Sequence, residues 1–68
     1  MHAPDFHRVT WYDRWRFRRW ERAAFAIEAI GRRQAALEAL WTAWVSRWPG
    51  TLPPSARLVE WHARRMSL

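Results

Sequence analysis

The chain has 68 residues, seven tryptophans, twelve basic residues that are all arginine, no cysteine and a formal net charge of +6. A chain of this length forms one domain, residues 1–68, whose core rarely supplies more than about 3–5 kcal/mol of stability. The missing cysteines exclude a disulfide-stapled fold, and His2, His7 and His62 lack the further ligands that a metal site needs. No catalytic or cofactor-binding motif is present, so we expect a protein that is not an enzyme and holds no cofactor or metal.

Residues 1–9 precede the first helix signal, and we expect them to form a flexible N-terminal segment. They have no apolar stretch of the kind that a signal peptide needs. The longest mostly apolar run, residues 35–45, is well short of the roughly 20 residues that span a bilayer. The sequence therefore predicts no transmembrane segment and a cytoplasmic location.

Helix signals begin at Thr10, which lies three residues before Asp13 in a pattern that resembles a capping box. No proline follows until Pro49, so the sequence predicts one long helix over about residues 11–48, roughly 57 Å long if continuous. Gly31 is its one weak point, at which the helix could bend or break, because a glycine inside a helix costs about 1 kcal/mol. No turn-forming residue adjoins Gly31, which favours a continuous or bent helix; a full break would give a compact three-helix bundle.

A proline-rich turn ends the long helix. Pro49 and Gly50 stop it, and Pro53 and Pro54 precede a short helix over about residues 55–66. The predicted fold class is thus all-α, with the short helix folding back on the long one as a helical hairpin. The residues that we expect to be mainly structural are Leu37, Leu40, Trp41, Trp44, Trp48, Leu58 and Trp61.

The apolar positions of the long helix recur every seven residues from Trp20 through Ile27 to Trp48. A return helix of about 18 Å covers only the C-terminal part of this seam. The part that precedes Ile30, with Trp20, Ala23 and Ile27, needs cover from a second copy of the chain or from another protein.

A stripe of tryptophan and arginine lies beside the seam, within about a sixth of a helical turn. Its members are Trp11, Trp15, Arg18, Arg22, Arg33 and Arg47. The tryptophans either stack against neighbouring arginines of the same chain or form an interface with a partner, since both residue types are enriched in binding hot spots. The residues that we predict to bind a partner are Trp11, Trp15, Arg18, Trp20, Arg22 and Ile27.

Three functions fit these patterns. The favoured one is a small non-catalytic protein–protein interaction module, such as an accessory subunit, assembly factor or inhibitor, because nucleic acid would not satisfy the uncovered apolar surface. A nucleic-acid-binding protein would use arginine–phosphate contacts and tryptophan–base stacking, but no zinc-finger, RNP or KH signature is present. A helix at a membrane surface is the third, and it is weakened because Trp15, Phe17 and Trp20 point in different directions. Small arginine-rich chains of this kind are common among phage proteins and accessory subunits, and no motif assigns this one to a family.

Overall fold

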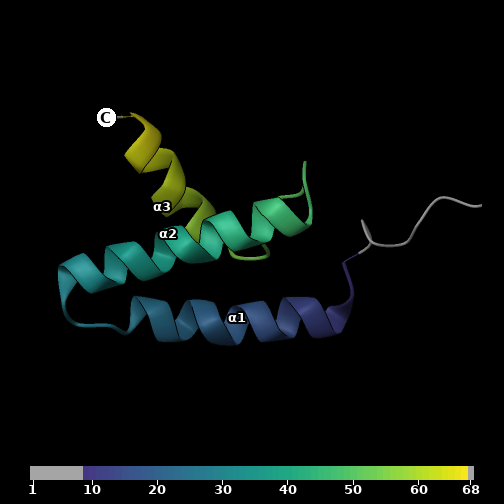
Figure 1. Ribbon diagram of the computed structural model, residues 1–68, viewed down its shortest axis with the longest axis horizontal. Coiled ribbons are helices and arrows are strands. Elements are labelled where there is room, and N and C mark those ends of the chain that lie inside the picture. Colours follow the sequence, from purple (N-terminus) through teal and green to yellow (C-terminus); the bar gives the residue numbers. More distant parts are fainter. Residues whose placement is uncertain (1–8, 68) are drawn as a thin grey trace, which may run out of the picture.

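The computed structural model describes residues 9–67, which form three helices and no strand. These are α1 (Trp11–Phe25), α2 (Ile30–Arg47) and α3 (Ala56–Ser67). In Figure 1, α1 and α2 run antiparallel beside each other, and α3 starts behind α2 and rises away from the pair. The all-α fold class and the hairpin packing are confirmed, whereas the predicted flexible segment, except for Val9, lies outside the described residues.

The helix predicted over residues 11–48 is divided into α1 and α2. The division lies at residues 26–29, and Gly31 lies inside the first turn of α2. The continuous or bent helix favoured by the sequence is therefore wrong, and so is Gly31 as the point of the break. The alternative with three helices is the one that forms.

Local hydrogen bonds hold the turn between α1 and α2. Ala26 N–H donates to the carbonyls of Arg22 and Ala23, both at 3.2 Å, and so tightens the last turn of α1. Arg33 Nη1 then donates to the carbonyl oxygen of Ile27 at 3.3 Å. These bonds replace part of the helical ladder that the turn interrupts, which lowers the cost of folding the chain back.

Packing between the two helices supplies the physical reason for the break. Phe17 and Ala24 of α1 are buried against a core that includes Leu37, Leu40 and Trp44 of α2. A straight helix of about 57 Å would leave these side chains in water, so burial of apolar surface favours the hairpin. The core is completed by Trp48 and Leu58, with Trp41 and Trp61 packed partly buried against it. The structural role predicted for the aromatic and leucine residues of α2 and α3 is confirmed.

The helix α3 packs against α2, as the sequence predicted, and then rises away from it (Figure 1). Trp61 Nε1 donates to Gln34 Oε1 at 3.0 Å, and Arg65 Nη2 lies 2.9 Å from Glu38 Oε2. The His62 ring stacks on Trp41 with centroids 3.7 Å apart and planes within 7°. These contacts tie α3 to α2 over about two helical turns.

A buried carboxylate joins α1 to the start of α3. Glu21 is only 7% exposed, and its Oε2 accepts hydrogen bonds from Ser55 Oγ at 2.8 Å and from Arg57 Nε at 3.1 Å. Ser55 Oγ also accepts from Leu58 N–H and thereby caps α3. The guanidinium of Arg57 lies over the Phe25 ring at 3.9 Å. This cluster holds the N-terminus of α3 against α1.

Candidate interaction surface

Large aromatic side chains are exposed on α1, the helix that the sequence singled out. Trp11 is 75% exposed, Tyr12 50%, Trp15 47% and Trp20 50%. Tyr12 contacts both of its aromatic neighbours, with ring centroids 6.3 Å from Trp11 and 6.0 Å from Trp15. Trp11, Tyr12 and Trp15 therefore form one exposed aromatic patch, to which we refer as the α1 patch.

The helix begins with the capping box that the sequence predicted. Asp13 N–H donates to Thr10 Oγ1 at 3.2 Å, while Asp13 Oδ2 accepts from Thr10 N–H at 3.2 Å and from Thr10 Oγ1 at 2.7 Å. The hydrogen bond from the Thr10 side chain is the main cause that lowers the pKa of Asp13 from its ordinary value of 3.8, and the charges of Arg47 and Arg16 act in the same direction. The box fixes the start of α1 and with it the orientation of the α1 patch.

Arginines stack on two of the exposed tryptophans. The guanidinium of Arg16 lies 4.5 Å from the ring centroid of Trp20, and that of Arg19 lies 5.2 Å from Trp15. The structure therefore contains stacking within the chain, which was one of the two interpretations of the tryptophan–arginine stripe. It involves Arg16 and Arg19 in place of the Arg18 and Arg22 that the sequence placed beside the tryptophans.

The charge of α1 is mostly not neutralised. Among residues 9–67, the ion pairs join Arg57 to Glu21, Arg64 to Glu60 and Arg65 to Glu38, so no arginine of α1 has an acidic partner there. A guanidinium that lies over a ring still directs its N–H groups outward in its own plane. The surface of α1 is thus both aromatic and positively charged.

The structure separates the predicted partner-binding residues into two sides of α1. Trp11, Trp15, Arg18 and Arg22 share one side and are exposed. Trp20 follows Trp15 by five positions, which places it about 140° away around the helix. Ile27 lies half-buried in the turn after α1 and belongs to neither side.

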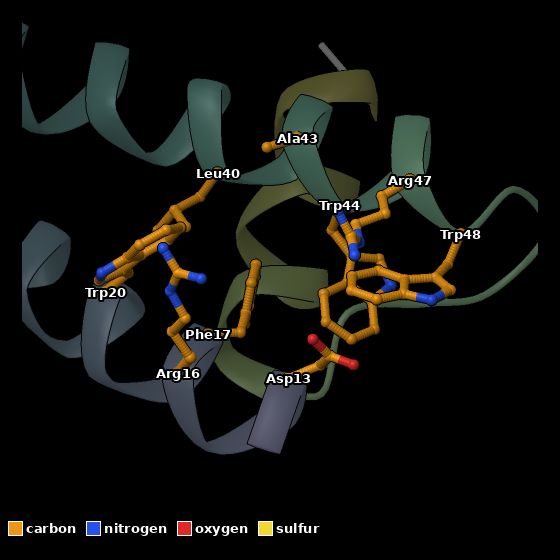
Figure 2. A pocket seen from close by; sticks show the side chains of 9 residues that line it. All are labelled: Asp13, Arg16, Phe17, Trp20, Leu40, Ala43, Trp44, Arg47 and Trp48. Carbon is orange, nitrogen blue, oxygen red and sulfur yellow. The ribbon is translucent and has the colours of Figure 1, made fainter. Parts of the chain in front are cut away.

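Trp20 faces a pocket between α1 and α2 that the sequence did not reveal (Figure 2). This α1/α2 groove has a volume of about 270 Å³. It is lined by Asp13, Arg16, Phe17, Trp20, Leu40, Ala43, Trp44, Arg47 and Trp48. In Figure 2, α3 lies behind the residues that line the groove.

Aromatic contacts shape the apolar floor of the groove. Phe17 meets Trp44 edge to face with centroids 4.9 Å apart, and Trp44 lies 4.4 Å from Trp48. Trp44 Nε1 donates to the carbonyl oxygen of Thr51 at 3.0 Å, which holds the indole in place. Each ring of the floor therefore contacts a neighbouring ring, and the Trp44 indole is also bonded to the backbone.

A shallow hollow on the outer side of α1 continues from the groove. Its lining residues all come from α1 and are Tyr12, Trp15, Arg16, Arg19, Trp20 and Ala23. Arg16 and Trp20 line both hollows, so the α1 patch, the stacked arginines and the groove form one continuous surface. Sequence reasoning missed Tyr12, Arg16 and Arg19, although the spacing of four between each arginine and its tryptophan was available as a signal.

The arrangement offers stacking, hydrophobic contact and anion binding. Within residues 9–67, no three side chains of histidine, cysteine, aspartate or glutamate are grouped in a way that could hold a metal ion. In the same part of the chain, no helix has both the length and the apolar character needed to cross a bilayer. Comparison of the chain with protein-family models, with curated proteins and with solved structures found no match.

Proposed function

We propose that this chain is a small non-catalytic helical module that docks a larger protein through α1, as an accessory subunit, assembly factor or inhibitor. The observation that supports this proposal is the exposure of Trp11, Trp15 and Trp20 on one helix, beside an apolar groove. Exposed aromatic and arginine side chains in one contiguous surface are the composition of protein interface hot spots. A protein partner and a cytoplasmic location belong to this proposal.

The exposed tryptophans offer a substantial gain on binding. Each one has on the order of 100 Å² left to bury, which is worth about 2.5 kcal/mol at the usual coefficient. Three of them would together contribute about 7.5 kcal/mol, against an association cost of about 4–15 kcal/mol. A useful affinity therefore also needs the arginines to find acceptors on the partner.

Stacking prepares two of the arginines for this role. Arg16 and Arg19 are held against Trp20 and Trp15, so less side-chain entropy is lost when their N–H groups bind a carboxylate. Their position between the α1 patch and the groove would let one partner contact both regions.

The proposal is tested with tagged protein and quantitative mass spectrometry of what it retains from a host-cell extract. We expect the double variant Trp15→Ala with Arg18→Ala to lose a specific protein partner by about tenfold or more. The control is Arg64→Ala, which removes an exposed arginine on α3 and should retain that partner. Retention of the same proteins by the double variant would contradict the proposal.

A second candidate is nucleic-acid binding, favoured by the arginines of α1 that have no acidic partner among residues 9–67. These would contact phosphates while Trp11 and Trp15 stack on unpaired bases. Size-exclusion chromatography with light scattering, followed at 260 and 280 nm, separates the candidates. A nucleic-acid absorbance excess that disappears at high salt supports this candidate, whereas a salt-resistant dimer would support self-association.

A further inference from the structure

The α1/α2 groove has a defined shape and charge that narrow the kind of partner it fits. Its walls come from two antiparallel helices, and its floor is formed by the buried rings of Phe17 and Trp44 together with Leu40 (Figure 2). Its volume of about 270 Å³ lies just below the range of roughly 300–1,000 Å³ typical of small-molecule pockets. The groove therefore suits one or two large side chains better than a cofactor.

Two arginines from opposite walls give the rim a positive charge. Arg16 of α1 is held over Trp20 at 4.5 Å, and Arg47 of α2 is held over Trp48 at 5.0 Å. The one carboxylate of the lining belongs to Asp13, which accepts two hydrogen bonds from Thr10 and whose pKa is also lowered by the charges of Arg47 and Arg16, so the lining keeps one net positive charge. The guanidinium groups of the rim are therefore the part of the groove that a ligand of opposite charge would meet.

We propose that the groove binds an acidic amphipathic helix of a partner protein, which inserts one bulky apolar side chain between α1 and α2. Aspartate or glutamate residues on either side of that apolar residue contact Arg16 and Arg47. This inference rests on the proposed function and names the chemical class of the protein partner. The groove then works in the helix-in-groove mode of peptide recognition.

The positive charge of the rim favours an acidic helix over a second copy of the chain as the occupant of the groove. A symmetric dimer through the groove would collect the arginine pairs of both copies in one interface, where the lining offers only the two Asp13 carboxylates to offset them. An extended peptide is also a poorer fit, since residues 9–67 contain no sheet edge to which it could add a strand. A helix with acidic residues satisfies both the apolar floor and the rim.

The test is a selection of single helices, randomised on one face and displayed as a library, against the immobilised full chain. Binders are then measured by fluorescence anisotropy against two variants of the chain. Ala43→Leu fills the groove from α2, and Ala63→Leu places the same side chain on the exposed surface of α3 as a control. We expect binders with a phenylalanine, leucine or tryptophan flanked by acidic residues, weakened about tenfold or more by Ala43→Leu and unaffected by Ala63→Leu.

A second pair of variants tests the charge without filling the groove, and also serves if Ala43→Leu fails to fold. Arg47→Glu reverses the charge on the rim, and Arg32→Glu reverses an exposed charge on α2 that does not line the groove. We expect only Arg47→Glu to weaken the selected helices, by about tenfold. Both variants are checked for folding by circular dichroism before binding is measured.

Any one of four results would overturn the inference. The selected helices could be basic or uncharged, or their binding could be unaffected by both Ala43→Leu and Arg47→Glu. Binding lost only in the Trp15→Ala and Arg18→Ala double variant would remove the groove inference and leave the proposed function standing. If a single-stranded oligonucleotide probe binds the chain and Ala43→Leu abolishes that binding, the groove accepts a base. This result would contradict both the groove inference and the proposed function.

Discussion

Replacement of Phe17 by leucine tests whether α1 docks on α2 as the structure shows. The ring is 5% exposed and meets Trp44 edge to face at 4.9 Å. Loss of this aromatic pair costs about 0.5–1.5 kcal/mol, and the change of shape in a packed core costs up to about 1.5 kcal/mol. Phe17→Leu should therefore lower the free energy of unfolding by about 2 kcal/mol, close to half of the roughly 3–5 kcal/mol available to a core of this size.

Urea unfolding followed by far-UV circular dichroism measures this loss. With a slope of about 1 kcal/mol per molar for a small protein, the midpoint should fall by about 2 M. The matched control is Trp11→Leu, which changes an aromatic residue that is 75% exposed and should shift stability by less than about 0.5 kcal/mol. Equal midpoints for Phe17→Leu and wild type would show that α1 does not pack through this ring.

Four further substitutions test the other supports of the fold. Glu21→Gln should lower the free energy of unfolding by about 1 kcal/mol in the same urea assay, because the amide oxygen of glutamine accepts from Ser55 and Arg57 without the charge of the carboxylate. Gly31→Ala should stabilise the fold by about 0.5 kcal/mol, because nothing lies within 4 Å of the added carbon. Gly50→Ala should destabilise the fold by about 1 kcal/mol, because Gly50 has a φ of 81°. Because the pKa of Asp13 is lowered in the fold, its capping contribution is present above its unfolded pKa of about 4 and is lost as the pH falls through the lower folded value. The thermal midpoint of the wild type should therefore fall more steeply on acidification than that of Asp13→Asn, and parallel curves would refute the role of that carboxylate.

The helix ends could be predicted where local chemistry decides them. Thr10 and Asp13 form the capping box that their spacing indicated, and Gly50 adopts the positive φ that a residue following a helix end often needs. The break between α1 and α2 could not be predicted in this way. Residues 26–29 contain neither glycine nor proline, and the turn forms because burial of Phe17 against α2 outweighs the local preference for helix.

The sequence predicted only part of the candidate surface, because the rest depends on how α1 packs on α2. The sequence indicated that Trp11 and Trp15 belong together, and the structure places both in the α1 patch. Which other residues join them depends on the side of α1 that meets α2, and the buried side contains Phe17 and Glu21 instead of the seam through Trp20. A buried glutamate interrupts the apolar pattern, so no hydrophobic period reveals that side.

Binding and folding should be coupled in this chain, because the helix proposed to meet the partner is held by few buried side chains. The core side of α1 contributes Phe17, Glu21 and Ala24, while its largest side chains lie outside. A partner present at about 100 times its dissociation constant would add about 2.7 kcal/mol of stability to the folded state. That gain in stability is similar to the loss expected for Phe17→Leu. A partner that binds α1 while this helix is packed on α2 should therefore restore the unfolding midpoint of this variant. A partner that binds α1 equally well when the helix is released from α2 would give no such rescue, and this difference separates recognition of the folded surface from recognition of the Trp/Arg sequence alone.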